Sequence, residues 1–199
     1  MSSTAILVLS VIALFFLRGS EASKCPTNWN VSMGSCRNLN ATSYQGIWYE
    51  QARSSSFVFD WGCYCTTANY TIDTLPAYVG VHNRCDKGKV GGDSSGSDGK
   101  AALVSAQLCG LSVSFFGPPG TDVNYQVFDT DYGRFSIVVT CGGTISRDLS
   151  LDSIWILSRT KVMDPQLLQS IIDRLSNMGF DFSDKVLTAQ GTGCIGQGY

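Results

Sequence analysis

The chain has 199 residues, of which 44% are hydrophobic and 15% are charged, with a formal net charge of -2. This charge balance excludes the basic surface that nucleic-acid binding requires, and the hydrophobic content excludes a globally disordered chain. The single histidine excludes a metal site built from several histidines. The length suits one domain.

The first feature in chain order is a predominantly apolar run from Ala5 to Leu17. It is short for a membrane-spanning helix but has the length of a signal-peptide core. Ser20 and Ala22 fit the small-x-small pattern that precedes cleavage, so we predict a signal peptide over 1–22 and one mature domain over 23–199. A buried or membrane helix is the alternative interpretation. We therefore expect a secreted, extracellular protein without a transmembrane anchor.

Cysteines and glycosylation sequons agree with secretion. Eight cysteines are present and all lie in the mature part, which is typical of a disulfide framework formed in an oxidising compartment. Three Asn-x-Ser/Thr sequons, at Asn30, Asn40 and Asn69, are predicted glycosylation sites.

Short extended segments fill most of the mature chain. We predict strands over 46–59, 63–72, 78–85, 101–109, 111–116, 123–128, 135–141 and 151–158, with a short late strand over 186–189. Such regular spacing is typical of an all-β sandwich or barrel. Residues 86–100 are rich in glycine and serine, and we predict a flexible loop there. The G-x-S-x-G pattern at 92–96 resembles a hydrolase motif, but it lacks the strand–turn–helix context that the motif needs.

One helix is predicted, over 164–178. Asp164 is a good N-cap and Pro165 suits the first helical position. Apolar residues then recur at helical spacing, and Gly179 ends the pattern. We expect the apolar stripe of this helix to pack on the outside of the sheet.

Three ordered motifs carry a family resemblance. They are Gly46-Ile47-Trp48-Tyr49-Glu50, Thr130-Asp131-Tyr132, and Arg159 at the end of a strand and before the helix. Together with their spacing and the signal peptide, they resemble a lipocalin. The resemblance is strongest to the apolipoprotein D and invertebrate pigment-carrier branch, which includes bilin-binding and crustacyanin-like proteins. Lys24-Cys25-Pro26, the segment 65–70 and Cys194 match that branch.

The resemblance implies an eight-stranded antiparallel up-and-down β-barrel, closed at one end, with the C-terminal helix packed outside. It also implies a cup for one small apolar ligand, which eight strands are wide enough to enclose. Trp48 would close one end, with Arg159 packed across its ring. The residues given a structural role are Gly46, Trp48, Thr130, Asp131, Tyr132 and Arg159.

Strand alternation predicts which side chains line the cup. Successive residues face opposite sides of a sheet, and a glycosylated Asn69 must point outward. The predicted ligand-binding residues are Glu50, Tyr64, Thr66, Ala68 and Tyr70, together with Asn83, Gln126 and Phe128, which the resemblance places inward. The aromatic residues either fill a core or contact the ligand. Buried amides need hydrogen-bond partners, so Asn83 and Gln126 are expected to contact a ligand or a trapped water.

The resemblance pairs Cys25 with Cys141 and Cys65 with Cys194. Among the other four cysteines, one antiparallel hairpin brings Cys63 and Cys85 to the open rim. The predicted remaining pairs are therefore Cys63–Cys85 and Cys36–Cys109. Alternation, however, turns Cys85 inward and Cys63 outward, which leaves open a free thiol at Cys85.

His82 faces outward in this register and inward if the register shifts by one residue.

The predicted function is extracellular transport of a small hydrophobic ligand such as a bilin or other tetrapyrrole, a carotenoid, a retinoid, a steroid or a fatty acid. No enzymatic activity, metal or required cofactor is expected, although a bilin or carotenoid would be a bound chromophore. Two alternatives remain: an isomerase that uses a free Cys85 thiol inside the cup, and a defence or interaction protein that acts through its outer loops, above all 86–100.

Overall fold

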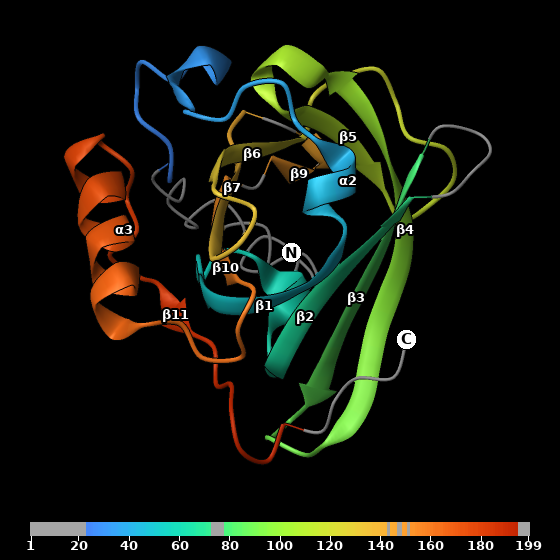
Figure 1. The fold of residues 1–199 in the computed structure, drawn as a ribbon, viewed down its shortest axis with the longest axis vertical. Coiled ribbons are helices and arrows are strands. Elements are labelled where there is room, and N and C mark those ends of the chain that lie inside the picture. The colour runs from blue at the N-terminus through green and yellow to red at the C-terminus, as the bar shows by residue number, and fades with distance from the viewer. Residues whose placement is uncertain (1–22, 73–77, 143, 147–148, 151, 195–199) are drawn as a thin grey trace, which may run out of the picture.

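The computed structural model describes residues 23–72, 78–142, 144–146, 149–150 and 152–194 (Figure 1). The predicted signal peptide over 1–22 lies outside the described residues. In the part of the chain that is described, no helix has the length and apolar character needed to cross a membrane.

Eight antiparallel strands close into a barrel (Figure 1). They are β1 (Gly46–Arg53), β2 (Cys63–Ile72), β3 (Val79–Lys87), β4 (Asp93–Ser105), β5 (Gly110–Ser114), β6 (Tyr125–Thr130), β7 (Phe135–Thr140) and β10 (Ser153–Ser158). Neighbours in this order pair with one another, and β1 pairs with β10, from Tyr49 opposite Ser158 to Arg53 opposite Trp155. The predicted fold class is therefore confirmed.

Shorter elements complete the fold. β8 (Thr144–Ser146) and β9 (Leu149–Ser150) form a separate hairpin, and β11 (Val186–Leu187) adds to β1. The helix α2 (Ala41–Tyr44) precedes β1, and α3 (Pro165–Asn177) follows β10. Three single 3₁₀ turns cover Val31–Met33, Val58–Asp60 and Ala106–Leu108.

The prediction of a flexible loop over 86–100 is wrong. Residues 93–100 belong to β4, which pairs with β3 from Lys87 opposite Asp93 onward (Figure 1). Pairing with β3 outweighs the low strand propensity of glycine and serine. Gly96 suits this strand because a Cβ there would lie 2.2 Å from the carbonyl oxygen of Asn83. The interaction-protein alternative loses the long loop on which it depended.

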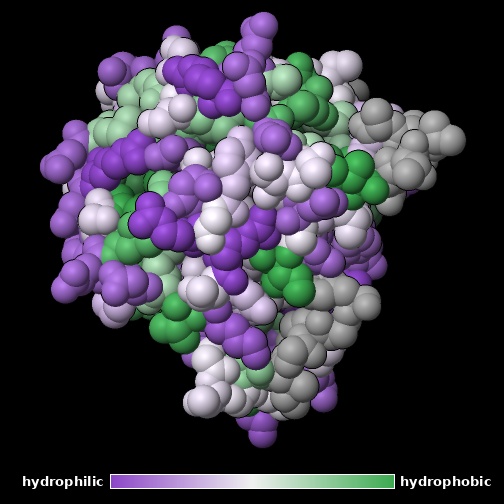
Figure 2. Space-filling view, in the orientation of Figure 1, coloured by the Kyte–Doolittle hydropathy of each residue, from purple (hydrophilic) through white to green (hydrophobic). Residues whose placement is uncertain are grey.

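The predicted helix is confirmed as α3, which lies along the outside of the barrel (Figure 1). The Asp164 side chain accepts a hydrogen bond from the backbone N–H of Leu167 at 2.9 Å, as an N-cap should. Ile171 and Leu175 are buried against the outward side chains of β6, β7 and β10. The face drawn in Figure 2 shows hydrophobic residues only in separate patches among hydrophilic ones.

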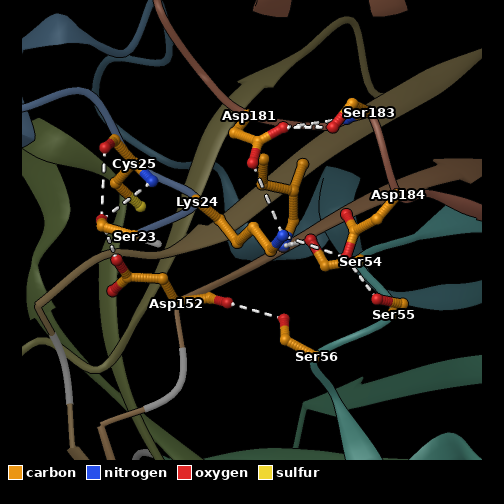
Figure 3. A network of polar contacts seen from close by, with 11 residues as sticks. Ser23, Lys24, Cys25, Ser54, Ser55, Ser56, Asp152, Asp181, Ser183 and Asp184 are labelled. Atoms are coloured by element: carbon orange, nitrogen blue, oxygen red, sulfur yellow. Dashed lines mark hydrogen bonds and ion pairs between the residues drawn. The ribbon is translucent and has the colours of Figure 1, made fainter. Parts of the chain in front are cut away.

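Ser23 and Lys24, at the start of the described chain, contact residues just before β10 and residues after α3. The Lys24 ammonium lies 3.0 Å from Asp184 and 3.6 Å from Asp181, and Ser23 hydrogen-bonds to Asp152 (Figure 3). The hydroxyl of Ser56 donates to the carbonyl of Asp152 at 3.0 Å. These contacts join the start of the described chain to the β1–β2 connection and the C-terminal segment.

All four predicted disulfides are present: Cys25–Cys141, Cys36–Cys109, Cys63–Cys85 and Cys65–Cys194. The conflict over Cys63 is resolved by a bulge in β2, where the register shifts between Tyr64 and Thr67 and Cys65 has a φ of 54°. The bulge places Cys63 opposite Lys87, which shares a face with Cys85. Because Cys85 is bonded, it offers no thiol for the isomerase alternative.

Replacing Leu175 with alanine tests the packing of α3 on the barrel. Leu175 is fully buried, so we expect the free energy of unfolding to fall by roughly 2–4 kcal/mol. Guanidinium unfolding followed by circular dichroism measures this. Ser176→Ala, at the exposed neighbouring position, serves as the control. Equal stability of the two variants would contradict the packing.

Candidate functional site

One end of the barrel is closed by Trp48 and Arg159. The Trp48 side chain is fully buried, and its indole N–H donates to the carbonyl of Tyr44 at 2.9 Å. The Arg159 guanidinium carbon lies 3.7 Å from the centroid of the Trp48 ring, a cation on an aromatic face. Its nitrogens also donate to the backbone carbonyls of Ser43, Tyr44, Gln45, Ile47 and Tyr132. We call this closed end the floor.

The turn between β6 and β7 supports the floor. One carboxylate oxygen of Asp131 accepts hydrogen bonds from three successive backbone N–H groups, those of residues 133–135. The hydroxyl of Thr130 accepts from the N–H of Tyr132, which has a φ of 62°. Gly46 has a φ of 90° and lies beside Arg159. These residues shape the backbone around the floor, the kind of role that the resemblance implied.

Aromatic side chains run through the barrel from its open end to the floor. We call this series the aromatic column: Phe57, Trp155, Tyr125, Tyr70, Tyr44 and Trp48. The ring centroids are 4.8 Å apart for Phe57 and Trp155 and 6.4 Å for Trp155 and Tyr125. The hydroxyls of Tyr70 and Tyr125 are 2.6 Å apart. The Tyr44 ring then lies 5.2 Å from that of Tyr70 and 5.1 Å from that of Trp48.

The tyrosines of the column are polar groups in an apolar interior. Burial raises the pKa of Tyr44 and of Tyr125 well above its ordinary value, and the neighbouring Tyr70 adds to both shifts. The Tyr44 hydroxyl also lies 2.8 Å from that of Ser136. The phenols therefore stay neutral at physiological pH and can act as hydrogen-bond donors or acceptors.

A small cavity adjoins the column. It has a volume of about 10 Å³ and is lined by Leu39, Ala41, Tyr44, Tyr70, Val79, Ala101, Leu111, Val113 and Tyr125. Such a volume holds roughly one water molecule, whereas pockets for small ligands measure about 300–1,000 Å³. A ligand must therefore displace the column side chains or lie beside them.

The open end is covered by residues 54–62, which we call the mouth loop. Phe57 extends from this loop onto Trp155, and the backbone carbonyl of Asp60 accepts a hydrogen bond from Arg53 at 2.8 Å. Phe59 and Trp61 are 56% and 62% exposed. The loop thus combines one aromatic contact with the interior and two aromatic residues facing solvent.

A buried ion pair lies beneath the mouth loop. Arg53 Nη1 is 3.1 Å from Glu50 Oε1, and the two side chains are only 5% and 3% exposed. The Thr188 hydroxyl donates to the same carboxylate oxygen. A register shift in β1 between Glu50 and Ala52 places Arg53 opposite Trp155, on the inner face. We call Glu50, Arg53, Asp60 and Thr188 the charged cluster.

Burial and, to a smaller extent, the nearby Asp60 carboxylate raise the pKa of Glu50 to about 7, although Arg53 and the hydrogen bond from Thr188 oppose them. Burial also raises the pKa of Asp60. The Nε of Arg53 and the Oγ1 of Thr66 are buried and have no hydrogen-bond partner among the described residues. These two buried polar atoms could each form a hydrogen bond with a further group.

The inner face includes several of the predicted lining residues. Glu50, Tyr70, Ala68 and Asn83 face inward by register, and Thr66 is buried beside them. Tyr64 is 37% exposed and pairs with Asp86 beyond the β2 bulge, so its predicted inward orientation is wrong. The bulge reverses the alternation that the prediction assumed.

Gln126 and Phe128 also face outward, contrary to the prediction. Phe128 packs between Trp29 and Phe180 under α3. The Gln126 amide donates to the carbonyls of Val31 and Leu108 at 2.7 and 2.9 Å. The inward residues of β6 are instead Tyr125 and Val127. The register that the resemblance implied for β6 therefore differs by one residue from the register in the structure.

Several inward residues were missed from the sequence, namely Arg53, Phe57, Tyr125 and Trp155. Arg53 required knowledge of the β1 bulge, and Phe57 comes from a connection that was predicted to be strand. His82, whose orientation was open, lies on the outer face, with Nδ1 2.9 Å from Asp98 and Nε2 3.3 Å from the hydroxyl of Thr71.

The three predicted glycosylation sites differ in exposure. Asn30 and Asn40 are exposed, and each side chain caps a helical turn by accepting a backbone N–H. Asn69 is half-buried and lies in β2 opposite Ile47 and His82.

Known proteins resemble this chain in sequence and in fold. The family model for the lipocalin-like domain matches residues 39–190. The Lazarillo protein of Schistocerca americana is 29% identical over 185 residues, which cover 92% of this chain and 85% of that protein. The outer membrane lipoprotein Blc of Escherichia coli K12 is 33% identical over 154 residues, 77% of this chain and 80% of that protein.

Solved structures confirm the fold. Insecticyanin from the tobacco hornworm Manduca sexta superposes with a TM-score of 0.62 at 18% identity, covering 81% of this chain and 86% of that one. Lobster apocrustacyanin A1 superposes with a TM-score of 0.58 at 19% identity, covering 81% and 91%.

The raised pKa of Glu50 predicts how stability depends on pH. The folded chain holds a proton on Glu50 up to about pH 7, whereas the ordinary value is 4.5. The free energy of unfolding should therefore fall as pH rises from 4.5 to 7, by at most roughly 3 kcal/mol. Glu50→Gln should lack this part of the slope, as guanidinium unfolding at pH 5 and pH 8 would show.

Asp173→Asn, which removes an exposed carboxylate on α3, is the control and should keep the wild-type slope. Asp60 is present in all three proteins, and because its carboxylate interacts with that of Glu50, the difference between wild type and Glu50→Gln measures the two groups together. The account fails if the wild type and Glu50→Gln show the same change in stability between the two pH values.

Proposed function

We propose, given that this chain belongs to the lipocalin family, that it is a secreted carrier which binds one small hydrophobic molecule inside the barrel. The observation that carries this proposal is the aromatic column, a series of rings in contact between the mouth loop and the closed floor. A molecule placed there would be shielded from water on all sides. Transport requires only binding and release, so the proposal includes no catalytic step.

The interior favours a ligand with an unsaturated, flat body. Trp155 and Tyr125 stack at an interplanar angle of 28°, and aromatic faces favour stacked partners. Bilins and carotenoids suit this surface, and bound pigments of this kind would be chromophores rather than required cofactors. Retinoids, steroids and fatty acids suit the apolar interior as well. The neutral hydroxyls of Tyr70 and Tyr125 offer hydrogen bonds to a carbonyl or hydroxyl group.

Secretion is supported by two independent features. Four disulfides join segments up to 129 residues apart, and such bridges persist in oxidising compartments. The apolar run from Ala5 to Leu17 has the length of a signal-peptide core.

The Trp155→Leu variant tests whether ligands bind along the column. We expect wild-type protein to bind biliverdin or retinol with saturable quenching of tryptophan fluorescence. Leucine removes the stacking surface between Phe57 and Tyr125, so affinity should fall about fivefold, since an aromatic contact contributes on the order of 1 kcal/mol beyond burial.

Phe116→Leu is the matched control, because Phe116 is 97% exposed outside the barrel and should leave the affinity unchanged. Circular dichroism checks that both variants fold. The proposal is overturned if neither molecule binds the wild type, or if the two variants bind with equal affinity.

A further inference from the structure

The guanidinium of Arg53 is an incompletely satisfied charge inside the barrel. It is buried between the β1 wall and the mouth loop, and its register position is opposite Trp155 of the aromatic column. One terminal nitrogen bonds to Glu50 and the other to the carbonyl of Asp60. The Nε–H is buried and has no partner among the described residues. Leaving such a donor unpaired is unfavourable, and more so when the donor belongs to a charged group.

Two carboxylates interact electrostatically with Arg53, and Glu50 is the one that forms an ion pair with it among the described residues. The charged or titratable groups near it are Glu50 from β1 and Asp60 from the mouth loop, with Lys87 of β3 acting on Asp60. The C-terminal segment contributes the neutral Thr188, which lies 3.4 Å from Arg53, and β10 contributes the indole of Trp155. Glu50 is therefore the direct ionic partner of Arg53.

We propose that Arg53 anchors the acidic head group of an amphiphilic ligand whose apolar body lies along the aromatic column. This inference rests on the proposed carrier function and makes it more specific: the preferred ligand is a hydrophobic carboxylic acid rather than its neutral counterpart. The Nε–H has no partner among the described residues, so a carboxylate oxygen brought against it would accept a charge-assisted hydrogen bond, which is a strong kind.

Binding of the acid requires a change in the protonation of Glu50. Two carboxylates beside one guanidinium repel each other, so the carboxylate of the ligand favours the protonated form of Glu50. The pKa of Glu50 is already raised to about 7 by burial, which keeps the cost of that protonation low near neutral pH. Ligand binding therefore takes up a proton, and the affinity for an acid falls as pH rises above 7.

cis-Parinaric acid and its methyl ester are the probes, because they share one fluorescent body and differ in charge. The acid is ionised at pH 6 and pH 8, since its carboxyl resembles that of glutamate, with an ordinary pKa of about 4.3. Wild-type protein should bind the acid up to about tenfold more tightly at pH 6 than at pH 8. Its affinity for the ester should not change.

Two variants isolate Arg53 without leaving Glu50 as a buried carboxylate that has lost its ion-pair partner. Glu50→Gln should bind the acid equally at both pH values, as tightly as wild type does at pH 6. The double variant Glu50→Gln with Arg53→Met should bind the acid no more tightly than the ester. Arg84→Met, which removes an arginine paired with Asp98 on the outer face, is the matched control and should behave as wild type.

The possible outcomes separate the two proposals. If acid and ester bind wild type equally, or the double variant keeps its preference for the acid, the role of Arg53 is overturned while the carrier function stands. If neither probe binds folded wild-type protein, the carrier function fails and the inference fails with it. Circular dichroism and a melting curve for each variant establish that loss of binding is not loss of folding.

Discussion

The pairing of β1 with β10 is the constraint on which the rest of the structure depends. It closes the sheet, so the inward residues of every strand share one interior. The floor lies at one end of this seam, where Arg159 follows β10 and packs on Trp48 of β1. The charged cluster lies toward the other end, where Arg53 is opposite Trp155. Closure thus places Arg159, which supports the floor, and Arg53, which is buried and incompletely hydrogen-bonded, at opposite ends of the same strand pair.

Two bulges modify the regular alternation of this barrel. The bulge in β1 turns Arg53 inward, and the bulge in β2 turns Cys63 inward toward Cys85 while Tyr64 becomes exposed. Each lies near the open end and re-aims the side chains that follow it, as bulges commonly do. The composition of the mouth region therefore depends on two local irregularities rather than on the strand pattern alone.

The limits of sequence reasoning follow from these irregularities. Most strand positions and α3 with its Asp164 cap were predictable because they depend on local signals. The family resemblance implied Cys25–Cys141 and Cys65–Cys194, and the geometry of one hairpin favoured Cys63–Cys85. The inward orientation of Arg53 was not, because a bulge leaves no reliable mark in one sequence. The strand at 93–100 was missed because pairing with β3 overrides its glycine-rich composition. Gln126 and Phe128 were misplaced because an error of one residue in register reverses every side chain.

Apolar and charged groups in the interior have complementary roles in the proposed carrier. The aromatic column offers surface for a hydrophobic body, and the charged cluster offers a polar end under the mouth loop. The cavity beside the column holds roughly one water molecule, so a larger molecule that enters it must displace the side chains around it. The mouth loop contributes one aromatic side chain to the column, Phe57.

The most direct test of the carrier account is the intact mass of the protein purified from its natural source, measured under native and under denaturing conditions. The account predicts an excess mass in the native state that disappears on denaturation, because all eight cysteines are paired and no thiol is available to hold a ligand covalently. Equal native and denatured masses, in protein isolated without detergent or organic solvent, would contradict the claim that the barrel carries a small molecule.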